Sequence, residues 1–247
     1  MQTNPIFASA VSIVPRPIFV VGTDTEVGKT FQAVRVVDAL SRAGRTVGVY
    51  KPVLSGVADI ETDKRGSPPV GLPADDASLL LRATGQRWPL DRVCPQAFSA
   101  PVAPPVAAKV EGKQVDEQLI VDGLTWWSGR CDILVVEGAG GVLSPISESA
   151  TILDLASLCS AQMIVVAANR LGVVNHTLLT LAAIRSRRLP ILGVVLNEIP
   201  RLTERGVAET DPDFEVDASR ETNLALLREW ETDVPISRDI LRLVSSI

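Results

Sequence analysis

Five short runs of consecutive apolar residues constrain the fold of this chain more than any other feature of its sequence. They lie at 18–21, 47–50, 133–136, 163–168 and 191–196 and are continuous, not alternating. Continuous runs of this length are typical of strands buried on both faces. Because helix-forming segments separate them, we expect a doubly wound α/β fold with a mainly parallel sheet. It should form a single domain over 17–247, after an N-terminal tail at 1–16.

Helical periodicity fills most of the chain between these runs. The expected helices cover 29–43, 76–83, 116–127, 151–159, 174–188 and 219–230. On the first of them, Phe31, Val34, Val37 and Leu40 mark the expected apolar face. Two stretches are irregular. The Gly- and Pro-rich segment 55–74 is a candidate substrate loop, and the acidic segment 201–218 is interpreted as a surface insertion.

Composition excludes several classes of function. The 24 Lys and Arg against 29 Asp and Glu give a net charge of −5, which argues against nucleic-acid or anionic membrane partners. No apolar run reaches the roughly 18–20 residues of a spanning helix. The three cysteines are far apart and His176 is the only histidine, so a disulfide framework, a zinc site and a Ser/His/Asp triad have no support. A reduced, cytoplasmic setting is expected.

A glycine-rich loop follows the first expected strand and leads directly into a helix. It reads GTDTEVGKT over 22–30, a phosphate-loop pattern whose first glycine stands one residue earlier than in the standard motif. In such a loop the backbone N–H groups at the helix start surround the phosphates. Lys29 then supplies positive charge, and the Thr30 hydroxyl ligates Mg²⁺. The chain is therefore expected to be of the P-loop NTPase type.

Charged residues also stand where two further strands end. Lys51 follows the run at 47–50, and Glu137 follows the run at 133–136 as a candidate metal ligand. At the carboxyl edge of a parallel sheet, where ligands bind, both side chains can face the phosphate loop. Asp75 and Asp76 begin the next expected helix. Asp75 is a candidate N-cap of that helix.

Together these segments resemble the dethiobiotin synthetase family. The matching strings are GTDTEVGKT, YKPVLSG at 50–56, the Asp pair, VEGAGG at 136–141, LGVVNH at 171–176 and Asn197, in the family's order. The family uses ATP and Mg²⁺ to convert 7,8-diaminononanoate and CO2 into dethiobiotin, ADP and phosphate, through a carbamate and a carbamic-phosphoric anhydride. Such chemistry needs no covalent enzyme nucleophile, since phosphoryl transfer rests on positioning and on charge neutralisation.

The resemblance implies a role for each matching residue. Lys29 and Lys51 are the implied catalytic residues, and Thr30, Asp76 and Glu137 the implied Mg²⁺ ligands. The implied nucleotide-binding residues are Thr25, Glu26, Val27, Gly28, Lys29, Thr30, Phe31, Asp76, Glu137, Gly138, Ala139, Gly140 and Asn197, the last at the adenine. The implied substrate residues are Ser55, Gly172, Val173, Val174 and Asn175, the last four donated across a homodimer to the substrate carboxylate. For His176 a helix-capping role is favoured.

Two departures and two alternatives stay open. The C-terminal segment 236–247 differs from the family's base-binding segment, which predicts weaker adenine selectivity, and Pro105 replaces a common histidine. One alternative is a regulatory or partitioning ATPase with a variant phosphate loop, which Asp24 disfavours because that class carries a lysine there. The other is an amide-forming synthase of the same superfamily, which normally adds a glutamine-hydrolysing domain.

Overall fold

The computed structural model describes residues 6, 13, 16–57, 75–199, 217–245 and 247. Almost all of the expected N-terminal tail lies outside these residues. So do most of the candidate substrate loop at 55–74 and most of the expected insertion at 201–218. Within the described ranges, no helix combines the length and the apolar character needed to cross a bilayer.

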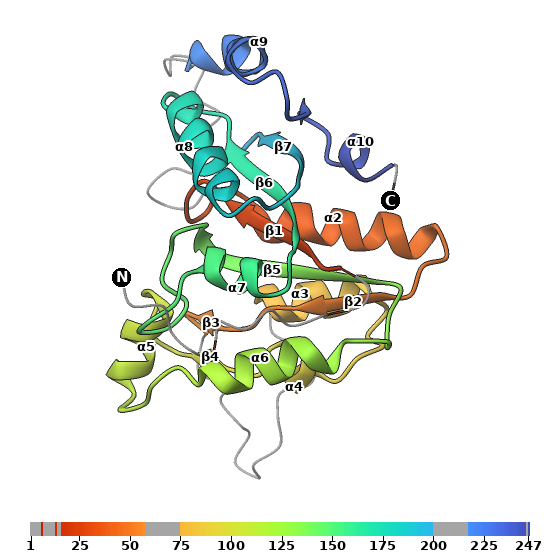
Figure 1. The fold of residues 1–247 in the computed structure, drawn as a ribbon, viewed down its shortest axis with the longest axis vertical. Coiled ribbons are helices and arrows are strands. Elements are labelled where there is room, and N and C mark those ends of the chain that lie inside the picture. The colour runs from red at the N-terminus through yellow and green to blue at the C-terminus, as the bar shows by residue number, and fades with distance from the viewer. Residues whose placement is uncertain (1–5, 7–12, 14–15, 58–74, 200–216, 246) are drawn as a thin grey trace, which may run out of the picture.

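A six-stranded sheet forms the centre of the molecule (Figure 1). Its order is β2-β5-β1-β6-β7-β8 and every neighbouring pair is parallel, so the predicted doubly wound architecture is confirmed. The strands are β1 (Ile18–Gly22), β2 (Val47–Tyr50), β5 (Ile133–Gly141), β6 (Gln162–Ala168), β7 (Ile191–Asn197) and β8 (Ile236–Ser237). All five predicted strands are present. The short β8 was not predicted, and β5 runs on through its glycines to Gly141.

Two residues of Leu54–Ser55 form β3, which pairs in parallel with β4 (Ala97–Phe98) in a separate small sheet. This pairing holds the backbone just after β2. It therefore fixes the course of the segment that runs from Lys51 to Ser55.

Helices cover both sides of the central sheet, as Figure 1 shows. α2 packs on β1, β2 and β5, while α8 packs on β6 and α7 on β5. The helices are α2 (Lys29–Arg42), α3 (Asp76–Ala83), α4 (Leu90–Val93), α5 (Pro104–Val110), α6 (Glu117–Trp126), α7 (Ile152–Leu158), α8 (Val173–Ser186), α9 (Ser219–Trp230) and α10 (Leu241–Val244). The helix predictions are confirmed apart from small shifts at their ends.

The buried face of α2 corrects one detail of the sequence prediction. Phe31 is 61% exposed and Val34 is only partly buried. Val37 and Leu40 are buried as predicted, and the buried face also includes Gln32, Ala33 and Val36. The face predicted from the apolar residues is therefore rotated from the buried face, because the buried face includes the polar Gln32.

Both faces of the central strands are buried, which explains why their sequences are continuously apolar. Every residue of β1 is buried, and Phe19, Val20 and Val21 are fully inaccessible to solvent. Because these strands are parallel, their carboxyl ends meet at one edge of the sheet. Gly22 pairs there with Gly141 of β5 and Val166 of β6.

Candidate active site

The phosphate loop connects β1 to α2 and is shaped by its glycines. Gly28 lies in the left-handed region with φ 87° and is the N-cap of α2. A Cβ on Gly22 would lie 2.5 Å from the Asp24 carbonyl oxygen and 3.1 Å from Lys29 Nζ. The loop can therefore fold back tightly over the end of β1 only with glycine at position 22.

Lys29 is held inside this loop. Its side chain is 7% exposed, and its ammonium donates a hydrogen bond of 2.9 Å to the Asp24 carbonyl oxygen. Burial, followed by the nearby charge of Lys51, lowers the pKa of Lys29 to about 8. A lysine with few partners of its own, at the start of a helix, is suited to bind an incoming anion.

Four side chains from separate segments converge beside the loop. Lys51, which follows β2, places Nζ 2.6 Å from Glu137 Oε1 and 2.9 Å from Asp76 Oδ2. The Thr30 hydroxyl oxygen lies 2.7 Å from Asp76 Oδ1 and 2.9 Å from Glu137 Oε1, so the two carboxylates compete for its single proton. The sequence prediction that these four residues share one site is consistent with this geometry.

Burial and mutual attraction set the charges in this cluster. Burial alone would lower the pKa of Lys51, but Glu137 and Asp76 outweigh it, and the pKa is raised. Burial would raise the pKa of Asp76, but Lys51 and the Thr30 hydroxyl bring it below its usual range. For Glu137, which is fully buried, burial prevails and raises its pKa. Lys51 is thus the permanent cation of the cluster.

The donor set fits Mg²⁺. Two carboxylates and a hydroxyl are hard oxygen ligands, and Mg²⁺ in nucleotide sites is typically held by one or two carboxylates together with phosphate oxygens and water. Glu137 Oε2 is buried and has no hydrogen-bond partner among the described residues, so a ligand is required to satisfy it. The cluster has only two such side chains, and nowhere in the described ranges do three or more His, Cys, Asp or Glu side chains form a group that could hold a metal.

The consecutive residues Asp75 and Asp76 have different hydrogen-bond partners. Asp75 is the N-cap of α3 and accepts a hydrogen bond from the Ser78 backbone N–H at 2.9 Å. Asp76 is the first residue of the helix and reaches the cluster. The assignment of Asp75 to capping is confirmed, and Asp76 is the aspartate that lies at the candidate metal site.

A cavity of about 330 Å³ opens in front of the cluster. It contains most of the predicted site residues and two that the sequence prediction missed, Val53 and Leu54. These two lie between Lys51 and Ser55, so their place in the chain was a usable signal. The lining residues are Thr25, Glu26, Gly28, Lys29, Thr30, Lys51, Val53, Leu54, Ser55, Asp76, Glu137, Ala139 and Gly140.

Four predicted nucleotide residues are not in this lining. Val27 is buried beneath the loop, and the Gly138 carbonyl accepts from Lys51 at 3.4 Å. Phe31 lies exposed on α2, where the Arg35 guanidinium stands 5.8 Å from its ring centre. Asn197, which ends β7, is buried and donates a hydrogen bond of 2.9 Å to the Val27 carbonyl oxygen.

The remaining predicted substrate residues form the start of α8. Gly172 is the N-cap with φ 90°, Val173 is buried, Val174 is partly buried and Asn175 is exposed. These residues also lie outside the cavity lining. The capping role favoured for His176 is wrong, because no side chain caps this helix and His176 is an exposed residue of its first turn.

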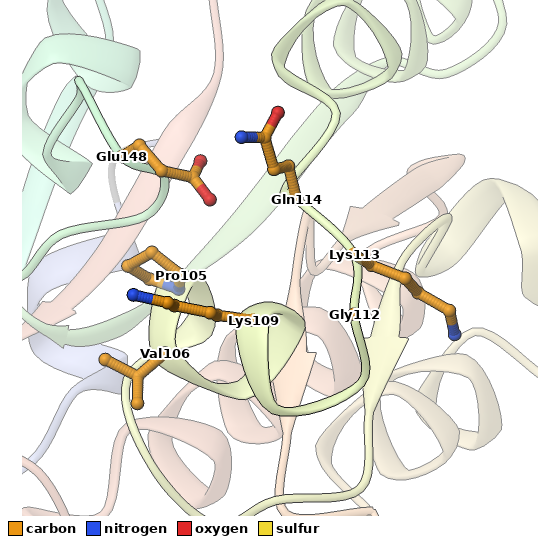
Figure 2. Close-up of a pocket in the computed structure, with 7 residues that line it drawn as sticks. All are labelled: Pro105, Val106, Lys109, Gly112, Lys113, Gln114 and Glu148. Carbon is orange, nitrogen blue, oxygen red and sulfur yellow. The ribbon is translucent and has the colours of Figure 1, made fainter.

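A second cavity, of about 780 Å³, lies along α5 (Figure 2). Pro105, Val106 and Lys109 form one side of it, and Glu148 faces them. It shares no lining residue with the cavity at the phosphate loop. Pro105 is thus not among the residues that line the cavity at the phosphate loop.

The cysteines take no part in either cavity. Cys94, Cys131 and Cys159 are free thiols. Burial raises the pKa of Cys131 to about 11 and the pKa of both others to about 12, which keeps them protonated and unreactive near neutral pH.

A phosphate loop between a buried strand and a helix, facing lysines and carboxylates at the carboxyl edge of a parallel sheet, defines a P-loop nucleotide-binding protein. A family model described as an AAA domain matches residues 16–228. The chain belongs to the ATP-dependent dethiobiotin synthetase family.

Three curated relatives show this membership. A Rhodopirellula baltica ATP-dependent dethiobiotin synthetase is 38% identical over 86% of this chain and 79% of its own length. The Anaeromyxobacter dehalogenans protein of the same name is 38% identical over 89% of this chain and 92% of its own length. The Bacillus subtilis protein of that name is 38% identical over 74% and 75% of the two chains. These relatives support the synthetase reading and neither of the alternatives.

Proposed function

We propose that this chain is an ATP- and Mg²⁺-dependent cyclo-ligase that makes dethiobiotin from 7,8-diaminononanoate and CO2. The observation that carries the proposal is the convergence of Lys29, Lys51, Thr30, Asp76 and Glu137 on one cavity. Two cations and a carboxylate pair around a phosphate loop suit phosphoryl transfer. The family relatives supply the identity of the reaction.

The reaction has three steps. One amine of the diamine attacks CO2 and loses a proton, giving a carbamate. A carbamate oxygen then attacks the γ-phosphorus of ATP and ADP leaves, so the product is a carbamic-phosphoric anhydride. Finally the second amine attacks the carbamate carbon and loses a proton while phosphate leaves, which closes the cyclic urea.

Lys29 and Lys51 are the proposed catalytic residues. Lys29 would bind the terminal phosphates, because it lies in the loop with its ammonium buried and bound by a single backbone oxygen. Lys51 would face the transferring phosphoryl group and the carbamate from the opposite side. A preorganised cation in such a site contributes on the order of 3 kcal/mol or more to stabilising the transition state.

The other nucleotide contacts are proposed from the loop and the sheet edge. Backbone N–H groups of 25–31 would surround the phosphates, and the segment Gly138–Gly140 would let the backbone approach the nucleotide closely. Thr30, Asp76 and Glu137 would hold Mg²⁺, which neutralises phosphate charge when bound. Asn197 is the proposed adenine contact, and the altered C-terminal segment predicts that bases other than adenine are also accepted.

The substrate would be bound by residues from two subunits. Ser55 lines the cavity and is the proposed contact near the amines. The start of α8, Gly172 to Asn175, is the proposed site for the substrate carboxylate, because the dipole at a helix N-terminus favours an anion. In the proposed homodimer this segment comes from the neighbouring subunit. We further propose a cytoplasmic location, in keeping with three free thiols.

The experiment that tests the proposal is a turnover assay with omitted components. ADP release should require the diamine and bicarbonate together, because phosphate transfer waits for the carbamate. ATP hydrolysis at the full rate without the diamine would instead indicate a regulatory ATPase. ATP hydrolysis driven by glutamine or ammonia would indicate another amide-forming synthase.

A further inference from the structure

Gln32 is a buried amide on α2 that the proposed chemistry does not use. Its side chain is 2% exposed on the face of the helix that packs against the sheet. Its Nε2 donates a hydrogen bond of 2.7 Å to Asn197 Oδ1. Its Oε1 accepts one of 3.3 Å from the Arg35 guanidinium. Burial of an amide costs free energy unless it is hydrogen-bonded, and these two bonds offset that cost for Gln32.

The direction of these hydrogen bonds is set by the groups at the two ends. The Arg35 guanidinium can only donate, so Gln32 turns its oxygen toward it and its nitrogen toward Asn197. Asn197 therefore presents its oxygen to Gln32 and its nitrogen to the Val27 carbonyl, which can only accept. With the Arg35 donor at one end and the Val27 carbonyl at the other, the side-chain amides of Gln32 and Asn197 can each be hydrogen-bonded in one orientation only.

Asn197 lies directly against the phosphate loop. Besides the bond from its Nδ2 to Val27, this nitrogen stands where a side chain on Gly28 would be, 2.1 Å from an ideal Cβ. Val27 and Gly28 precede Lys29, so the amide of Asn197 supports the turn that presents Lys29 and the helix N–H groups. The orientation of that amide thus decides how the loop is held.

Arg35 extends the connection to the segment after β8. Its Nη2 is 2.8 Å from Asp239 Oδ1, and Asp239 in turn accepts from the Leu241 backbone N–H at 3.2 Å. The relay from Asp239 through Arg35, Gln32 and Asn197 to Val27 therefore joins the C-terminal segment to the phosphate loop. That segment is the one expected to lie near the nucleotide base.

We propose that Gln32 is a positioning residue for nucleotide binding, which fixes the amide of Asn197 so that Asn197 supports the phosphate loop. The inference rests on the proposed nucleotide site. Gln32 touches none of the reacting atoms, so its loss should weaken nucleotide binding and leave the chemical step and diamine binding nearly unchanged.

The first test replaces Gln32 with methionine, which has a similar length and no hydrogen-bonding amide. We expect Gln32→Met to bind Mg-ADP about 10-fold more weakly by calorimetry and to raise the KM for ATP by a similar factor. The kcat and the KM for diaminononanoate should stay within about 2-fold. The matched control is Gln96→Met, which removes the hydrogen bonds that Gln96 makes with Asp116 and should leave all four quantities unchanged.

Two further variants test the direction of the relay. Gln32→Glu keeps the size and the acceptor for Arg35 but has no N–H for Asn197, so it should weaken Mg-ADP binding at least as much as Gln32→Met. Combining Gln32→Met with Asn197→Ala should weaken binding no more than Asn197→Ala alone, because both changes remove the same support. Wild-type affinity in Gln32→Glu, or fully additive losses in the double variant, would overturn the proposal.

Mg-ADP binding by the wild type separates a failure of the proposed function from a failure of the role of Gln32. If the wild-type protein does not bind Mg-ADP, the proposed function itself fails. If the wild type binds and the Gln32 variants bind equally well, only the role of Gln32 fails. Should Gln32→Met not fold, Arg35→Met cuts the relay at its partly exposed end. Weaker Mg-ADP binding by that variant supports the proposal, and unchanged binding contradicts it.

Discussion

Lys51 and Glu137 form a buried ion pair in which Nζ lies 2.6 Å from Oε1, with the two side chains 4% and 0% exposed. Lys51 follows β2 and Glu137 lies within β5, and these two strands are neighbours in the sheet. Lys51 also pairs with Asp76, whereas Glu137 forms its ion pair with Lys51, so removal of Lys51 leaves a buried carboxylate without its cation. Loss of Lys51 should therefore lower both the stability of the fold and the activity.

This coupling predicts different outcomes for single and double variants. Lys51→Met should lower the free energy of unfolding by about 3 kcal/mol, because it leaves the Glu137 carboxylate unpaired. Adding Glu137→Gln should restore most of that loss. Activity should remain at least ~100-fold reduced in both, because a catalytic cation is absent. Denaturant unfolding and turnover are the measurements, and a stable, active Lys51→Met enzyme would remove Lys51 from the site.

Variants of Asp75 and Asp76, at the start of α3, should have different effects on stability and on the Mg²⁺ requirement. Asp76→Asn should raise the Mg²⁺ concentration needed for half-maximal turnover, because it removes an anionic oxygen from the proposed metal site. Asp75→Ala should leave that concentration unchanged and lower stability by about 1 kcal/mol, through loss of the N-cap bond to Ser78. Magnesium titrations of both variants check this. The reverse pattern would show that Asp75 is the ligand.

Two glycines with similar backbone angles offer a matched test of the phosphate loop. Gly28 and Gly44 have φ of 87° and 82°, but only Gly28 has neighbours within 4 Å of an added Cβ. Both alanine variants should lose about 1–2 kcal/mol through left-handed strain. Gly28→Ala should also lose Mg-ADP binding, because its Cβ would displace Asn197. Equal nucleotide affinities of the two variants in calorimetry would argue against that contact.

The proposed sharing of sites between subunits predicts complementation. Lys29→Ala and Asn175→Ala should each be nearly inactive alone, since one lacks a phosphate contact and the other a carboxylate contact. In a mixed dimer, one site carries both changes and the other carries neither. Random exchange should therefore recover roughly a quarter of wild-type activity. Absence of recovery despite demonstrated subunit exchange would contradict a site built across the subunit interface.

The sequence predicts the main strands and several catalytic positions because both leave local signals. The long strands are continuous apolar runs, and Lys51 and Glu137 directly follow two of them. The two-residue strands β3, β4 and β8 are too short to show any periodicity. The extension of β5 through 137–141 depends on pairing with β1, and its Glu and Gly residues are poor strand formers.

The burial of Gln32 could not be predicted from the residues around it. It stands among alternating apolar and polar residues of α2, where an exposed position is the ordinary expectation for glutamine. Its burial depends on Asn197, which lies far along the chain and reaches the helix only once the sheet has formed. Such a long-range amide pair has no signature in the sequence around either residue.

Formation of a cyclic urea from CO2 with the energy of ATP is the reaction proposed for this chain. The most direct measurement is to incubate it with 7,8-diaminononanoate, carbon-13 bicarbonate and Mg-ATP and to analyse the products by mass spectrometry. We expect dethiobiotin labelled with carbon-13, with one ADP and one phosphate formed for each molecule of product. Consumption of ATP with no labelled dethiobiotin would contradict it.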